Sequence, residues 1–195
     1  MGIDRLSRAA ADAFVREGII QQEDYEIYRY GVETGLMMLV NLALSAALAA
    51  GFRMLPEGLL FLALYIPLRS YAGGCHAGSI VSCTCISQII VAAELLAARW
   101  ATGLPAWGIA LWAGASLAVN VPGICLLAPV DSKNHLLDEE ERTHSRRMTY
   151  RVLAVQVGIC GIGFLLGKRC LVVAPANAWM IQNLLLWLGI SPSIR

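Results

Sequence analysis

Residues 105–127 read PAWGIALWAGASLAVNVPGICLL, a run of 23 residues that contains no Asp, Glu, Lys or Arg. A helix that crosses the hydrocarbon core of a bilayer needs about 20 mostly apolar residues, because each residue adds about 1.5 Å to a path about 30 Å long. This run is therefore long and apolar enough to span a membrane as a helix.

Five further segments have the same character, although the second of the resulting six is short. In chain order, the expected spans are Val32–Leu55, Glu57–Leu68, Gly78–Ala98, Pro105–Leu127, Met148–Gly167 and Cys170–Gly189. The composition agrees, since 57% of the 195 residues are hydrophobic, only 15% are charged, and the mean hydropathy is +0.62. Such proportions are far from those of soluble domains and predict an all-α, polytopic membrane protein with about six membrane helices.

No repeat of fixed period and no low-complexity segment divides the chain, so residues 1–195 are interpreted as a single integral membrane domain. Residues 1–30 are expected to form an amphipathic, cytoplasmic N-terminal segment, and residues 31–195 the membrane helices and loops. The apolar residues near one helical face are Ile3, Leu6, Ala10, Ala13 and Phe14. This stretch can lie along the membrane surface or form a solvated helix packed on its own loops.

Basic residues are distributed unevenly between the two sides of the expected six-span topology. With both termini on one side, 11 of the 15 Lys and Arg residues fall on that side, and the other side receives Arg53, Arg99, Lys168 and Arg169. Lys and Arg accumulate in cytoplasmic loops, so both termini are predicted to be cytoplasmic. The net charge of +1 gives no reason to expect a nucleic-acid partner, which requires a concentrated basic face.

Two polar interruptions, both on the predicted cytoplasmic side, are where chemistry is expected. The first is Arg69–Ser79 and the second is Pro129–Arg147. The mixed charges of the second are more typical of a solvated helix with i,i+4 pairs, such as Asp138 with Arg142, than of a binding site. The first interruption is therefore the more informative of the two.

Residues 69–83 read RSYAGGCHAGSIVSC, which places a histidine, two cysteines and a Gly-Gly pair at a membrane edge. Gly73 and Gly74 can adopt backbone angles closed to other residues, so the chain can turn sharply before the third span. Such a turn is able to direct His76 back toward the helix that follows.

Helical phase selects one of the nearby cysteines as the partner of His76. If His76 opens the third span, Cys83 lies seven residues further on and within about 20° of the same face. Cys85 then points the opposite way, and Cys75 projects about 100° around the helix. Two turns separate the Cα atoms of His76 and Cys83 by about 10.5 Å in a straight helix, so contact requires the glycine turn to fold the histidine over the thiol.

A cysteine and a histidine in contact can carry out nucleophilic catalysis. The thiolate is the reactive form, and a nearby imidazolium favours it. His76 can supply this charge and later protonate a leaving amine. Candidate groups to hold a developing oxyanion are the backbone amides near Gly73 and Gly74 and the side chains of Ser79 and Ser82.

Other interpretations of this cluster stay open. Its members can be packing residues, and the chain can be a non-catalytic scaffold for a signalling partner. The cluster can also bind a soft metal in a small membrane metal-binding or transport protein, although the spacing is not that of the usual CxxC pairs. Glu94 is the main ionisable residue within a span that a transporter could use. The preferred interpretation includes no metal and no cofactor.

At this motif the chain resembles the accessory gene regulator B (AgrB) family, bacterial membrane endopeptidases that process the precursors of cyclic autoinducing peptides. The resemblance rests on Arg69, Ala72-Gly73-Gly74, His76-Ala77 and Cys83, on Ala128-Pro129-Val130-Asp131 with Asn134 and Leu137, and more weakly on Tyr30-Gly31-Val32-Glu33. Together with the length and the hydrophobic layout, it extends over nearly the whole chain.

The resemblance implies a thiol protease of the cell membrane that acts in quorum sensing, with an AgrD-like precursor as its substrate. Cys83 would attack the peptide bond before the precursor's C-terminal tail to give an acyl-enzyme thioester, with His76 as the base. A thiol or hydroxyl of the precursor would then close a thiolactone or lactone ring. The resemblance also implies a homodimer. Substrate-binding candidates are Arg69, Lys133 and Asp131, of which the last can instead orient His76 or cap a helix.

Overall fold

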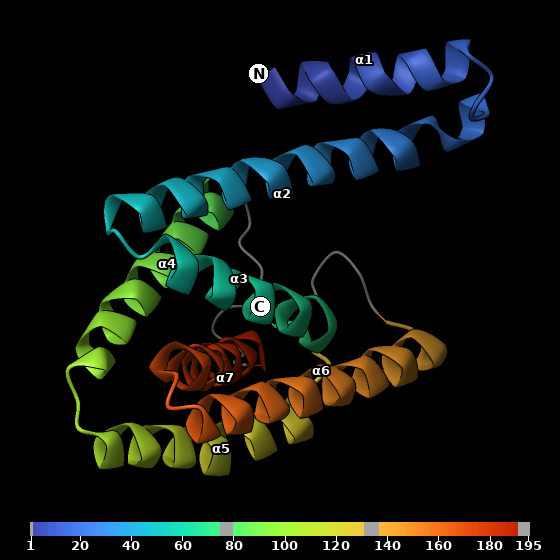
Figure 1. Ribbon diagram of the computed structural model, residues 1–195. Helices are drawn as coiled ribbons and strands as arrows, with labels where there is room; N and C mark the ends of the chain where they lie inside the picture. The colour runs from blue at the N-terminus through green and yellow to red at the C-terminus, as the bar shows by residue number, and fades with distance from the viewer. Residues whose placement is uncertain (1, 75–79, 131–136, 191–195) are drawn as a thin grey trace. The chain divides into compact units, whose positions relative to one another are not determined.

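The computed structural model describes residues 2–74, 80–130 and 137–190 of the chain, and apart from one isolated β-bridge their regular structure is helical. The elements are α1 (Gly2–Arg16), the short 3-10 helix η1 (Gln22–Asp24), α2 (Tyr25–Gly51), α3 (Leu55–Ala72), α4 (Ile80–Thr102), α5 (Ala106–Leu127), α6 (Glu139–Leu165) and α7 (Arg169–Ile190). The chain forms two compact units, residues 1–47 and residues 48–195, and α2 runs through their boundary. Figure 1 shows the elements in chain order.

The polytopic all-α fold predicted from the apolar runs is confirmed. Helices α2 to α7 correspond one to one with the six expected segments, and five of them are long and apolar enough to cross a membrane. Helix α3 is the remaining one, as it has 18 residues and carries Glu57 and Arg69 near its ends. It is also the counterpart of the segment expected to be short. The single-domain interpretation of residues 1–195 stays a prediction.

Two helices begin more than one turn earlier than the hydropathy alone indicated. Helix α2 begins at Tyr25, within the predicted N-terminal segment, and α6 begins at Glu139, within the second polar interruption. The start of α6 has a clear cause in a capping box. Asp138 Oδ1 accepts a hydrogen bond from Glu141 N at 2.7 Å, and Asp138 N donates to Glu141 Oε2 at 3.2 Å. These reciprocal bonds satisfy amides that would otherwise lack partners at the helix start.

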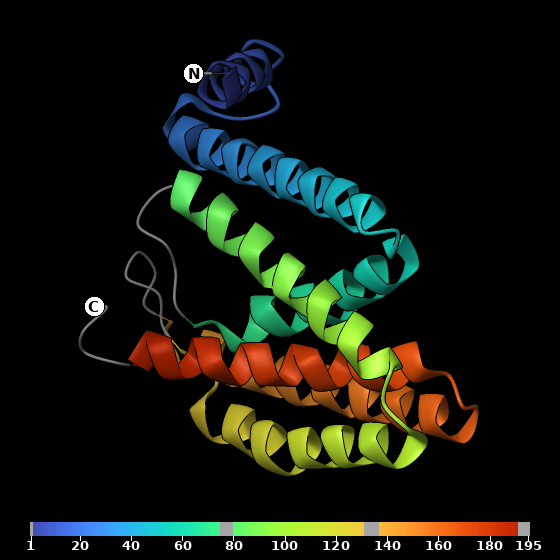
Figure 2. The same ribbon diagram turned by 90° about the vertical axis from the view of Figure 1, so that its left-hand side faces the viewer.

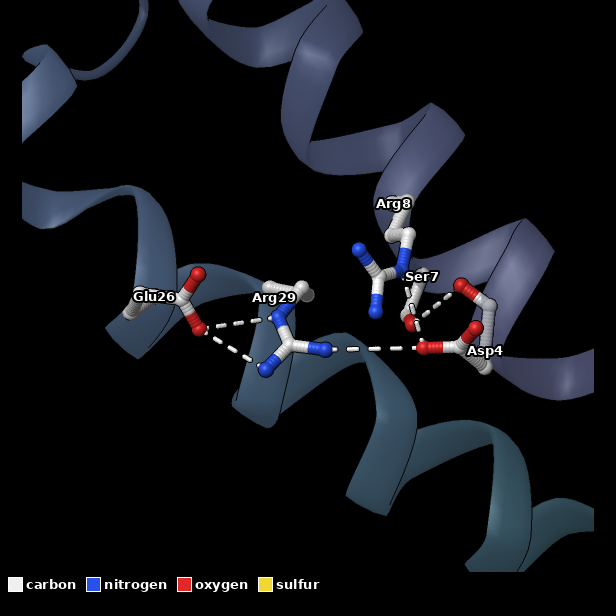
Figure 3. A network of polar contacts seen from close by, with 5 residues as sticks. All are labelled: Asp4, Ser7, Arg8, Glu26 and Arg29. Atoms are coloured by element: carbon white, nitrogen blue, oxygen red, sulfur yellow. Dashed lines mark hydrogen bonds and ion pairs between the residues drawn. The ribbon is translucent and has the colours of Figure 1, made fainter.

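In the first unit, the ion pair of Arg29 with Asp4 connects α2 to α1. Arg29 of α2 lies 2.8 Å from a carboxylate oxygen of Glu26 and 3.5 Å from one of Asp4, which also pairs with Arg8 at 3.0 Å (Figure 3). The hydrogen bond that Arg8 Nε donates to Asp4 Oδ1, more than the charge of Asp4, raises the pKa of the Arg8 guanidinium above its ordinary value. Leu6, on the predicted apolar face of α1, remains 60% exposed. Helix α1 thus contacts α2 through polar groups and through the edge-to-face pair of Phe14 with Tyr28.

In the second unit, α7 is the central helix. It contacts α3, α4, α5 and α6, and it is the most buried of the candidate spans (Figure 2). Two glycines permit close approach to it, because a Cβ at Gly163 would lie 2.5 Å from Leu171 Cβ and one at Gly123 would lie 2.6 Å from Asn183 Oδ1. Small residues at helix contacts are a common device in membranes, where close packing stabilises association.

Buried polar side chains join the helices of this unit. Gln156 of α6 donates from Nε2 to the Leu64 carbonyl of α3 at 2.8 Å and accepts from Trp179 Nε1 of α7 at 2.7 Å. A second set connects α4, α5 and α7, since Asn177 donates to Glu94 Oε2 at 2.6 Å and accepts from Trp112 Nε1 at 3.0 Å. These bonds satisfy polar groups that lack water as a partner inside a bilayer.

Candidate functional site

The Gly-Gly pair after α3 adopts backbone conformations that favour glycine. Gly73 has φ 70° and Gly74 has φ 120°, and the Gly73 N–H closes α3 by donating to the Arg69 carbonyl at 3.2 Å. A Cβ at Gly73 would overlap the carbonyl oxygen of Val130. The predicted sharp turn is therefore present, and side chains larger than hydrogen are excluded from it by both conformation and contact.

This turn brings the two polar interruptions together. Gly73 and Val130 form a parallel β-bridge, and Val130 N donates to the Ala72 carbonyl at 3.1 Å. Nearby, Tyr71 of α3 packs edge to face on His144 of α6, with ring centroids 6.4 Å apart. The end of α3, the segment after α5 and the charged start of α6 thus meet at one end of the second unit.

The carbonyl of Gly73 is held from two directions. Arg69 Nη1 donates to it from the last turn of α3, and Gln182 Nε2 donates to it from α7 at 2.9 Å. Gly74 lies directly against α7, because a Cβ there would be 3.1 Å from the Leu185 carbonyl oxygen and would overlap the Arg69 guanidinium. Arg69, a predicted substrate-binding residue, is thus also part of the structure of the turn.

Cys83 lies in the first turns of α4, with an exposed and free thiol. Cys85 on the same helix is exposed as well, so exposure does not distinguish the two. Helix α4, which carries both thiols, packs against α3.

Several predicted site residues lie outside the described part of the chain: His76, Ser79, Asp131 and Lys133. The described predicted residues are Arg69, Gly73, Gly74, Ser82 and Cys83. The approach of His76 to Cys83 thus stays a prediction, and so do the roles of all these residues. Of the predicted oxyanion donors, the Gly73 N–H already closes α3 by donating to the Arg69 carbonyl.

The metal alternative is described only in part, because Cys75 and His76 lie outside the described residues. Residues 2–74, 80–130 and 137–190 contain no group of three or more His, Cys, Asp or Glu side chains able to hold a metal ion. Glu94 is 2% exposed, and its carboxylate accepts a hydrogen bond from Asn177 between two helices. This contact gives Glu94 a role in helix association.

Two residues at this end of the unit were not anticipated from the sequence. Gln182 contacts the turn across 109 residues of chain, and His144 presents a second imidazole close to the end of α3. The signal for Gln182 was its presence as an amide within an apolar span, since polar residues in membrane helices are costly and often functional. His144 follows the capping-box start of α6, whose Asp138-x-x-Glu141 spacing is visible in the sequence.

The helices and the turn together define a polytopic helical membrane protein with a glycine turn at the end of α3 and a free thiol in the first turns of α4. The family model for accessory gene regulator B matches residues 7–191, which is nearly the whole chain. The chain therefore belongs to the accessory gene regulator B family, membrane cysteine endopeptidases that process the AgrD propeptide in quorum sensing. Searches of curated proteins and of solved structures gave no match.

Proposed function

We propose that this peptidase removes the C-terminal tail of an AgrD-like propeptide through an acyl-enzyme thioester on Cys83. The thiolate of Cys83 attacks the carbonyl carbon of the peptide bond before the tail. The C–N bond then breaks, and the nitrogen of the departing tail receives a proton from His76. The acyl group remains on the Cys83 sulfur as a thioester.

Ring closure follows from the same intermediate. A thiol or hydroxyl of the precursor attacks the thioester carbonyl, its proton passes to His76, and the Cys83 thiolate leaves. The product is a thiolactone or lactone, and the enzyme returns to its starting state. Since one acyl transfer replaces another, the activated acyl bond is retained in the product, whereas hydrolysis would lose it.

The observation that carries this proposal is the anchored glycine turn. Gly73 and Gly74, three and two residues before His76, are fixed by contacts to α3, α7 and Val130, while Cys83 occupies the start of the next helix. A rigid support for the histidine segment suits catalysis, because reacting groups must be held close to their productive geometry.

The remaining parts of the proposal concern the precursor and the assembly. Arg69, Asp131 and Lys133 are proposed to bind the precursor, and Gly74, Ser79 or Ser82 to donate to the oxyanion. The uneven distribution of Lys and Arg supports cytoplasmic termini, which would present this site to a precursor made in the cytoplasm. The enzyme is proposed to act as a homodimer, as its family resemblance implies.

Co-expression with an epitope-tagged AgrD-like precursor tests the proposed dyad. Cys83→Ala and His76→Ala are expected to abolish removal of the tail, measured as a shift in precursor mass. The matched controls are Cys85→Ala, which removes the other thiol on α4, and His144→Ala, which removes the other imidazole near the turn. Both controls are expected to retain cleavage.

Other outcomes would change the assignment of the nucleophile or of the base. Loss of cleavage in Cys85→Ala with retention in Cys83→Ala would move the nucleophile to Cys85. Loss in His144→Ala with retention in His76→Ala would make His144 the base. Retention in both Cys83→Ala and His76→Ala would exclude the dyad.

A further inference from the structure

Gln182 connects the central helix to the turn that precedes His76. It lies in α7 and is completely buried, and its Nε2 donates to the Gly73 carbonyl at 2.9 Å. Its other polar atom, Oε1, is buried without a hydrogen-bond partner among the described residues. Within the described structure, the hydrogen bond of the Gln182 side chain is therefore the one to the Gly73 carbonyl.

The hydrogen bond from Gln182 acts on Gly73, whose backbone conformation sets the direction of the chain after α3. Gly73 has φ 70°, and its carbonyl receives donors from both Arg69 and Gln182. Arg69 is on the same helix as the turn, four residues before Gly73, so its bond fixes the turn relative to α3. Gln182 belongs to α7, so its bond fixes the turn relative to the helix on which the second unit is packed.

We propose that Gln182 is a positioning residue of the peptidase, which holds the Gly73–Gly74 turn so that the segment after it presents His76 to Cys83. This inference rests on the proposed function of His76 and Cys83. In the described structure, the hydrogen bond of Gln182 is made to the Gly73 carbonyl. It acts through the backbone of Gly73.

A matched control is available in Gln156. This residue is also a buried glutamine, 1% exposed, and its Nε2 also donates to a backbone carbonyl of α3, that of Leu64 at 2.8 Å. It additionally accepts from Trp179 at 2.7 Å, so its replacement disrupts at least as much structure as that of Gln182. Leu64 lies nine residues before Gly73, within the body of α3. Loss of the Gln156 contact should therefore leave the turn in place.

The test measures the reactivity of the Cys83 thiol and the kinetics of cleavage in the full-length protein in lipid nanodiscs. Wild type, His76→Ala, Gln182→Met and Gln156→Met are treated with iodoacetamide between about pH 6 and pH 9, the range in which cysteine thiols ionise. Mass spectrometry follows alkylation of the peptide that carries Cys83. Methionine is chosen because it approximates the size of glutamine without its donor.

The expected result is that Gln182→Met resembles His76→Ala, with slow alkylation near neutral pH that recovers in alkali. Gln156→Met is expected to keep the wild-type pH profile. In cleavage assays kcat of Gln182→Met should fall by about 10²-fold with KM little changed, because a misplaced catalytic group slows the chemical step without weakening precursor binding. If Gln182→Met does not fold, Gln182→Glu takes its place in the same measurements.

A wild-type profile and wild-type kcat in Gln182→Met, beside a changed profile in His76→Ala, would overturn the role of Gln182 and leave the dyad intact. Equal defects in Gln182→Met and Gln156→Met would also overturn it, because they would reflect general loss of packing. A wild-type profile in His76→Ala would instead contradict the proposed function on which the inference rests.

Discussion

At the scale of single residues, the contacts at the end of α3 converge on Gly73. Its N–H closes the helix, its carbonyl accepts from Arg69 and Gln182, and its backbone pairs with Val130. Because these contacts fix the segment, it cannot move to accommodate a new side chain. The same constraint applies to the neighbouring Gly74.

Replacing Gly74 by alanine should block processing of the precursor. The residue has φ 120°, and an added Cβ would overlap the Arg69 guanidinium and lie 3.1 Å from the Leu185 carbonyl oxygen. Forcing a non-glycine residue into such a conformation costs about 1–3 kcal/mol, before the contacts are counted. Cleavage of a tagged precursor in membranes measures the effect.

The control for this change is Gly158→Ala in α6, where an added Cβ meets nothing within 4 Å. This variant should process the precursor as wild type does and be equally or more stable, because alanine favours the helix by about 1 kcal/mol. Normal processing by Gly74→Ala would show that the turn tolerates displacement.

Substitutions of Glu94 provide a second test at the residue scale. They distinguish a role of this side chain in helix packing from a role in transport. Glu94→Gln should retain near wild-type processing, since a side-chain oxygen can still accept from Asn177 Nδ2, now at 2.6 Å from Glu94. Glu94→Leu should lower stability by about 1–3 kcal/mol, because the buried Asn177 donor then has no acceptor. Thermal unfolding in detergent, followed beside the cleavage assay, checks both. Abolished processing in a stable Glu94→Gln variant would instead assign the carboxylate an ionisable role.

At the scale of helices, the start of α6 shows how local chemistry extends an element beyond its apolar run. Asp138→Ala should fray the first turn of α6 at a cost of about 0.5–2 kcal/mol, because the capping box with Glu141 is lost. Hydrogen–deuterium exchange of residues 139–145 is the measurement, with Glu140→Ala as the control that removes a nearby carboxylate outside the box. Equal protection in wild type and Asp138→Ala would contradict the capping role.

The helices were largely predictable because length and apolarity are properties of the sequence alone. The runs around 105–127 and 170–189 identified α5 and α7 to within one residue at each end. The capping residues at its start indicate where α6 begins. The hydropathy pattern does not, because the first turns of the helix are charged. The contact between Gln182 and Gly73 was not predictable, because it depends on how helices far apart in the chain pack together.

At the scale of the whole molecule, the orientation of the helices decides which side of the membrane each loop faces. Cys170 is exposed in the first turn of α7, and Leu185, against Gly74, lies 15 residues further along that helix. That separation corresponds to about 22 Å at 1.5 Å per residue. The turn and Cys170 are therefore near opposite ends of α7.

A membrane-impermeant maleimide applied to intact cells should label Cys170 and spare Cys83. The reason is the excess of Lys and Arg on the side of the turn, which favours a cytoplasmic location. Permeabilised cells should then allow labelling of Cys83, and Cys170→Ser should remove the external signal. Labelling of Cys83 from outside would reverse the proposed orientation.

The central claim is that Cys83 carries the precursor as a thioester, and intact-mass measurement of the enzyme tests it most directly. The substrate is a precursor in which the candidate ring-closing Cys and Ser residues are replaced by Ala, so that the acyl-enzyme persists. The account predicts an added mass equal to the tail-less precursor minus one water, released by hydroxylamine, present in Cys85→Ala and absent in Cys83→Ala. The same adduct on Cys83→Ala would contradict it.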